Sequence, residues 1–135
     1  MRKVTLLLVC AALCILCGCS GKSLPAGMEE ETLISAGREI LLMAVEGDYE
    51  AVHGLLRQDV RGSVTVEQIR NLVFTQTDGA GAYKQIEDSM TTAQTAQGET
   101  FGVAVFYCEY SEDDVLFRIS FDREMRFIGL AVQKQ

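Results

Sequence analysis

Residues 99–121 read ETFGVAVFYCEYSEDDVLFRISF, and this stretch decides the fold. β-Branched and aromatic residues alternate on both sides of the polar segment at residues 111–113, a pattern typical of two strands joined by a turn. The neighbouring segments show the same composition and are bounded by short polar turns. Connections this short join antiparallel neighbours. The sequence therefore predicts a four-stranded antiparallel meander with strands at about Tyr83–Ala93, Glu99–Tyr110, Asp114–Phe121 and Arg126–Val132.

The hairpin also predicts two different sheet faces. With Tyr110 opposite Val115, alternate apolar residues form a core face: Ala104, Phe106, Cys108, Phe117, Ile119 and Phe121. The other face is too apolar to be left in water and is expected to be a pocket wall or a dimer interface. This second set is Phe101, Val103, Val105, Tyr107, Glu109, Leu116 and Arg118. Glu109 and Arg118 alternatively form a cross-strand ion pair.

The chain before Gly81 has a helical period instead. A first helix is expected from Thr32, and Asp48 is a suitable N-cap for a second. Thr65 and Gln68 have the spacing of a capping box at the start of a third helix. Three helices followed by four strands indicate an α+β domain over residues 32–135, with the helices packed on one face of the sheet.

The N-terminus has the pattern of an export signal. Arg2 and Lys3 precede an apolar run that ends at Cys17, shorter than the roughly 20 residues that a spanning helix needs. Residues 16–19, Leu-Cys-Gly-Cys, resemble the bacterial lipobox, which implies cleavage between Gly18 and Cys19 and a diacylglycerol on the Cys19 thiol. The expected product is anchored by membrane lipid, faces the outside of the cytoplasm and carries a flexible tether over residues 19–31. An uncleaved N-terminal helix and a plain secretory signal are the alternatives.

Charge and composition exclude several functions. From Cys19 onward the chain carries 19 acidic and 10 basic residues without a basic cluster, so nucleic-acid binding is not expected. His53 is the only histidine and Cys108 the only cysteine after Cys19, which leaves no conventional zinc site and no internal disulfide; no metal or cofactor is expected. Candidates for acid–base chemistry exist, but their spacing does not demand catalysis: Asp59, Tyr83, Tyr107 and Glu109.

Four stretches resemble the family called domain of unknown function 3887: residues 47–52, 65–73, 81–84 and 121–130. The resemblance covers about Thr32 to Val132. That family is similar to the nuclear-transport-factor-2-like, cystatin-like cone superfamily, which implies a curved sheet wrapped by helices with room for a cavity. Its members occur largely in Firmicutes and related bacteria. Some are lone lipoproteins, and in others the domain precedes an α/β-hydrolase domain. No hydrolase domain is expected in this chain, which reads to Gln135 without one. The turn at residues 122–125 lacks the glycine common there.

These observations predict a lipid-anchored extracytoplasmic protein whose cone-like domain is non-catalytic and binds a small apolar ligand or a protein partner. A homodimeric scaffold built through the second sheet face is the alternative. A cavity enzyme of isomerase or hydrolase type is the third hypothesis, because the cone superfamily also hosts acid–base enzymes.

Overall fold

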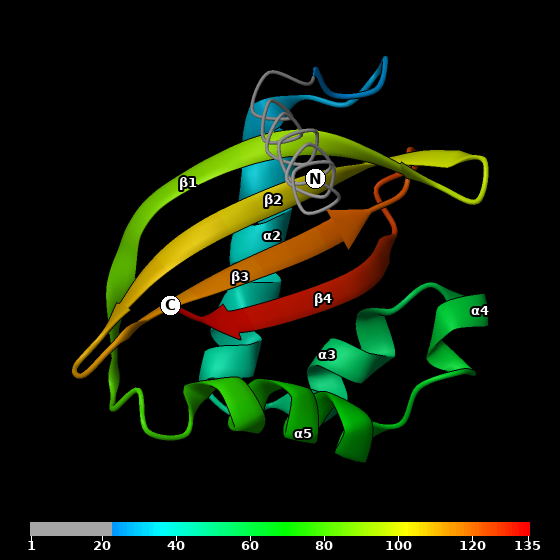
Figure 1. Cartoon of the computed structure of the whole chain (residues 1–135). Coiled ribbons are helices and arrows are strands. Elements are labelled where there is room, and N and C mark those ends of the chain that lie inside the picture. The colour runs from blue at the N-terminus through cyan, green and yellow to red at the C-terminus, as the bar shows by residue number, and fades with distance from the viewer. Residues whose placement is uncertain (1–22) are drawn as a thin grey trace, which may run out of the picture.

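The computed structural model describes residues 23–135 and shows an α+β fold, as predicted (Figure 1). The predicted signal peptide and Cys19 lie outside the described residues. Within residues 23–135 no helix is long and apolar enough to cross a membrane. The helices are α2 (Glu30–Val45), α3 (Tyr49–Leu55), α4 (Gln58–Arg61) and α5 (Val66–Thr77). The strands follow as β1 (Tyr83–Ala96), β2 (Glu99–Tyr110), β3 (Asp114–Phe121) and β4 (Phe127–Lys134).

The helix caps form where the sequence places them. The Asp48 side chain accepts a hydrogen bond from the Ala51 amide, 3.2 Å away. At α5 the Gln68 amide donates to the Thr65 hydroxyl (3.1 Å) and the Gln68 side chain accepts from the Thr65 amide (2.9 Å). Both contacts satisfy amides that a helix leaves unpaired at its start. Helix α2 begins two residues before the expected Thr32, and the short α4 was not predicted.

The four strands form one antiparallel sheet in sequence order. The predicted pairing of Tyr110 with Val115 is wrong, because Cys108 stands opposite Val115. The last pair before the turn is Glu109 with Asp114. Within the turn, the amides of Glu112 and Asp113 both donate to the Ala80 carbonyl, at 2.7 and 3.2 Å. A shift of two residues leaves every side chain on its original face, so the assignment of the faces survives the error.

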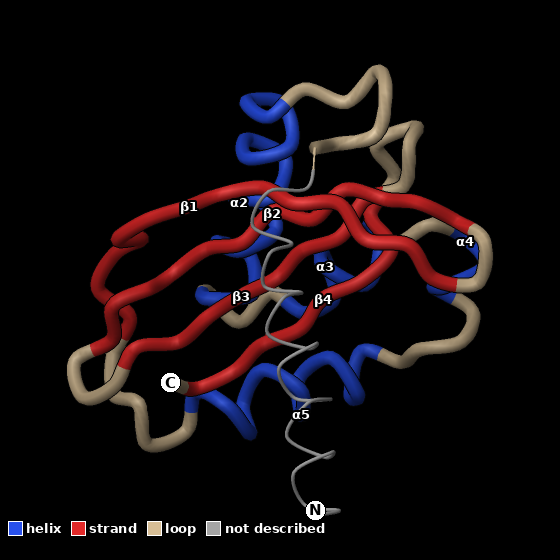
Figure 2. Tube along the Cα trace, turned by 45° about the horizontal axis from the view of Figure 1, so that its top comes forward, coloured by secondary structure: helices blue, strands red, loops and turns tan. Residues whose placement is uncertain are grey.

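The core lies between the sheet and helices α2, α3 and α5, and α2 crosses the sheet on one face (Figures 1 and 2). The predicted core face is confirmed, because all of its members are buried there: Ala104, Phe106, Cys108, Phe117, Ile119 and Phe121. Gly37 permits the close approach, since a Cβ at this position would stand 2.9 Å from the Cβ of Ala104. Helices α3, α4 and α5 gather beside β4, at the opposite edge of the sheet from β1 (Figure 1).

Candidate functional site

The candidate site lies where the chain between α3 and α4 meets the start of β4. Leu56 pairs with Phe127 as an isolated parallel bridge, and the Arg57 amide donates to the Phe127 carbonyl at 2.8 Å. Both bridge residues are buried. They line two depressions, which we call the cleft and the groove.

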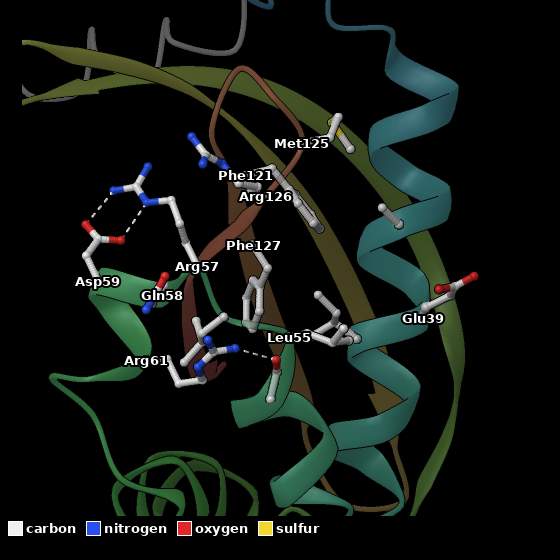
Figure 3. A pocket seen from close by; sticks show the side chains of 14 residues that line it. Glu39, Leu55, Arg57, Gln58, Asp59, Arg61, Phe121, Met125, Arg126 and Phe127 are labelled. Carbon is white, nitrogen blue, oxygen red and sulfur yellow. Dashed lines mark hydrogen bonds and ion pairs between the residues drawn. The ribbon is translucent and has the colours of Figure 1, made fainter.

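The cleft opens between α2, the α3–α4 segment and the β3–β4 turn, with a volume of about 1090 Å³ (Figure 3). Its apolar lining is Ala36, Ile40, Leu55, Leu56, Phe121, Met125 and Phe127. Leu55 is 49% exposed although it is a large apolar residue. The polar lining is Glu39, Gln58, Asp59, Arg57, Arg61 and Arg126. A cleft with an apolar surface and a polar border suits a ligand with an apolar body.

Arg57 is the centre of the polar wall. Its guanidinium contacts Asp59 through two nitrogens, at 2.8 and 3.1 Å, as the dashed lines in Figure 3 show. The remaining terminal nitrogen donates to Glu99 and to Asp122, both at 3.0 Å. Since Glu99 begins β2 and Asp122 follows β3, one side chain fastens the α3–α4 segment to two hairpin ends. Hydrogen bonds that Arg57 donates to these three carboxylates raise the pKa of its guanidinium, which therefore stays charged.

Asp122 is the buried member of this network, with only 3% of its surface exposed. One carboxylate oxygen accepts from the amides of Glu124 (2.9 Å) and Arg126 (2.8 Å). The other accepts from the Arg126 and Arg57 side chains, at 2.8 and 3.0 Å. Burial alone raises the pKa of Asp122, but these hydrogen bonds outweigh it and hold the pKa below its usual value.

The arginine network keeps Asp59 and Asp122 ionised. The hydrogen bond from Arg57 lowers the pKa of Asp59, as the network does for Asp122. A carboxyl group that acts as a general acid near neutral pH needs a raised pKa, usually from an apolar pocket. Both carboxylates are instead held ionised as counter-ions of arginine.

His53 and Arg61 stabilise the backbone around the cleft. The His53 Nε2 donates to the carbonyls of Val64 (2.8 Å) and Arg61 (3.2 Å). Since both partners are carbonyl oxygens, this nitrogen must carry the proton. The Arg61 side chain donates to the Gly54 carbonyl at 3.0 Å. The histidine therefore closes the turn after α4.

The groove lies on the other side of the Leu56–Phe127 bridge, between α5 and β4, with a volume of about 420 Å³. Its lining contains no charged side chain: Val52, Leu56, Val60, Ser63, Val64, Gln68, Ile69, Leu72, Phe127, Ile128, Gly129 and Leu130. Leu72 on α5 is 37% exposed. The groove is therefore more apolar than the cleft and has an edge strand as one wall.

The residues predicted for a pocket or interface lie elsewhere, on the sheet face turned away from α2. Val103, Val105 and Leu116 form a small apolar cluster there, with Phe101 packed against it. Tyr107 is 39% exposed on the same face. None of the predicted set lines the cleft or the groove.

The expected ion pair between Glu109 and Arg118 does not form. The register places Asp114 opposite Glu109 and Val105 opposite Arg118. Glu109 instead accepts a hydrogen bond from the Gln85 side chain at 2.9 Å. The error follows from the two-residue error in register.

The structure separates the four acid–base candidates. Asp59 lines the cleft, whereas Glu109 and Tyr107 lie on the outer sheet face. Tyr83 packs edge-on against the Tyr110 ring, with the ring centres 5.6 Å apart. Cys108 is buried in the core, where desolvation raises the pKa of its thiol to about 12. These groups therefore do not form one reactive centre.

The chain is similar to one protein family and to one solved structure. Residues 38–130 match the model of the family described as protein of unknown function (DUF3887). The chain belongs to this family. A solution NMR structure of a protein from Ruminococcus gnavus ATCC 29149 has the same fold, with a TM-score of 0.69 and 22% identity over 82% of this chain and 96% of that one. None of the curated proteins matches the chain.

Met125 in the β3–β4 turn has an unusual backbone conformation. Met125 adopts a φ of 64°, in the left-handed region that glycine occupies without steric cost. Its amide donates to the Asp122 carbonyl at 2.9 Å, and its side chain lines the cleft. The turn therefore contributes an apolar side chain to the candidate site.

Proposed function

We propose that this DUF3887 chain is a non-catalytic binding protein of the cell envelope, anchored by lipid on Cys19, and that its cleft binds a small ligand with an apolar body. The observation that carries the proposal is the cleft itself, which buried Ile40, Phe121 and Phe127 line together with the exposed Leu55. A ligand that covers this surface gains about 25 cal/mol for each Å² of apolar area removed from water.

The polar wall supports the same proposal. Each oxygen of the Asp122 carboxylate already has two hydrogen-bond donors, and Arg57 and Arg126 both contact carboxylates. A neutral ligand therefore leaves few charged groups to desolvate without a partner. The ionised state of both aspartates argues against the acid–base hypothesis.

The ligand proposal is tested with N-phenyl-1-naphthylamine, a neutral apolar fluorophore, and residues 23–135. This part contains every described helix and strand and both apolar clusters, so we expect it to fold on its own. Fluorescence should rise on binding, and Leu55→Glu should weaken the affinity at least about tenfold because it places a charge in the apolar opening. Leu42→Glu is the matched control, since Leu42 is 38% exposed on α2 and does not line either depression. Equal losses in both variants would contradict a site in the cleft.

The anchor is tested separately in the full chain. Cys19→Ser should abolish palmitate incorporation and move the protein out of the membrane fraction, because only the cysteine thiol accepts the diacylglycerol. Cys17→Ser is the control and should leave both unchanged. Membrane retention and labelling of the Cys19→Ser protein would contradict the anchor.

A further inference from the structure

Strand β4 is an edge of the sheet, and half of its main-chain groups point away from β3. The Gln135 amide points toward β3 and donates to the Asp114 carbonyl at 2.9 Å. The Lys134 amide points away from β3 and donates to the Gln76 side chain, also at 2.9 Å. Main-chain groups alternate in direction along a strand, so those of Leu130 and Val132 point outward with Lys134. Within residues 23–135 no hydrogen-bond partner lies on that side of Leu130 or Val132.

At both ends of this stretch, an outward main-chain group of β4 already has a hydrogen-bond partner. At one end the Arg57 amide occupies the Phe127 carbonyl, and at the other the Gln76 side chain occupies the Lys134 amide. The interval between, Ile128 to Val132, is roughly 14 Å long. The protein's own Leu56 already pairs with this edge as a one-residue parallel strand. The edge is therefore able to accept a strand, but only a short one.

The groove lies along the same stretch. Ile128, Gly129 and Leu130 form one wall, and Gln68 and Leu72 of α5 belong to its lining. Its volume of about 420 Å³ is within the range of ligand-binding pockets. Unpaired main-chain donors and acceptors beside an apolar groove match an extended polypeptide, which presents main-chain groups and side chains with the same two-residue repeat.

We propose that the groove binds an extended peptide segment of a partner protein, which adds to the β4 edge as a short strand. The peptide main chain bonds to Leu130 and Val132, and its alternate side chains enter the groove beside Leu72. These inward side chains are apolar, because the groove offers no charged partner to an ion. The protein carries a formal net charge of −7, so basic side chains are favoured at the outward positions and ends of the peptide.

The hydrogen bonds at both ends of this stretch argue against a second copy of the chain as the occupant. Strand β4 itself is 8 residues long, from Phe127 to Lys134, whereas the free interval runs only from Ile128 to Val132. Two β4 edges therefore do not fit along each other without displacing the Arg57 and Gln76 contacts. A short segment of another protein needs no such displacement.

The test uses residues 23–135 and a short capped peptide in which valine alternates with threonine between terminal lysines. Hydrogen exchange followed by NMR should show the Leu130 and Val132 amides slowed by at least about tenfold when peptide is present at about 1 mM. The same peptide with alternate backbone amides methylated is the control. It keeps the side chains but loses main-chain donors, and should give no protection.

Two variants on one helix locate the contact. Leu72→Glu should abolish the protection, because it places a charge in the groove. Phe74→Glu should retain it, since Phe74 is 58% exposed on α5 and does not line the groove. Unchanged exchange of the Phe106 amide in the core shows that each variant is folded.

Three results would overturn the proposal. No protection at Leu130 and Val132 would exclude strand addition. Equal binding of the methylated peptide would mean that the groove takes any small apolar molecule. Protection that appears without peptide and grows with protein concentration would assign the edge to a second copy of the chain.

Discussion

The cleft and the groove share Leu56 and Phe127 but satisfy their polar groups in opposite ways. In the cleft, charged side chains neutralise one another around Arg57 and Asp122. In the groove the lining has no charge, and the polar groups without a partner belong to the main chain of β4. This difference is the basis of our two proposals, a small apolar ligand for the cleft and an extended peptide for the groove.

The largest expected effect comes from removing Asp122, the buried carboxylate that binds the cleft residues Arg57 and Arg126. Asp122→Ala leaves the Glu124 and Arg126 amides and part of Arg57 without an acceptor, and should lower the free energy of unfolding by about 3 kcal/mol. Chemical denaturation measures the change.

Asp59→Ala is the matched control for this prediction. Asp59 binds the same arginine, but its side chain is 67% exposed, so water replaces the lost contact and the effect should be much smaller. Equal effects of the two substitutions would show that burial does not distinguish the carboxylates. The groove contains neither residue, so peptide binding by the folded Asp122→Ala protein should be unchanged.

Acid should weaken the network of the cleft and leave the groove unaffected. The pKa of Asp122 lies below its ordinary value of 3.8 in the folded protein. Its contribution to stability is therefore complete above that value and is lost as the pH falls through the lowered pKa. The stability difference between the native protein and Asp122→Asn should stay constant from about pH 7 to about pH 4 and shrink toward about pH 2.

Denaturation midpoints of the two proteins across this range test the prediction, and a difference that grows in acid would contradict it. Peptide binding provides the comparison with the groove. Because the groove has no ionisable side chain in its lining, the affinity for the same peptide without its terminal lysines should not change while the protein remains folded.

The smallest expected effect lies outside both depressions, in the β1–β2 turn. Gln97 and Gly98 both have positive φ, 53° and 80°, which is the geometry of the two-residue turn that favours Asn-Gly. Gln97→Asn should raise the free energy of unfolding by roughly 0.5 kcal/mol, because asparagine adopts this conformation at lower cost. Thermal denaturation measures the shift, and fluorophore and peptide affinities should not move. A lower melting temperature would contradict this account of the turn.

The sequence predicts the layers of the fold better than the site. Alternation from Phe101 to Cys108 specifies which side chains enter the core, and a register error of two residues does not change it. Capping residues such as Asp48 and Thr65 act on neighbours three positions away, so their roles are visible in the sequence. Helix α4 has only 4 residues, too few for a periodic pattern.

The site depends on contacts between distant residues. Arg57 lies 42 positions from Glu99 and 65 from Asp122, and its sequence pattern does not indicate either partner. The sequence does not reveal the groove either, because Leu72 and Leu130 line the same groove only when α5 packs beside β4. Of the four acid–base candidates named from the sequence, only Asp59 lines the cleft.

Native mass spectrometry of residues 23–135, purified without detergent, tests the central claim that the cleft is a ligand site. We predict a monomer that carries additional non-covalent mass, absent from Leu55→Glu and retained in Leu72→Glu. A bare monomer that also fails to bind N-phenyl-1-naphthylamine would contradict the claim. A bare dimer would contradict it as well, and would point to the outer sheet face around Val105 and Leu116 as an interface between two copies.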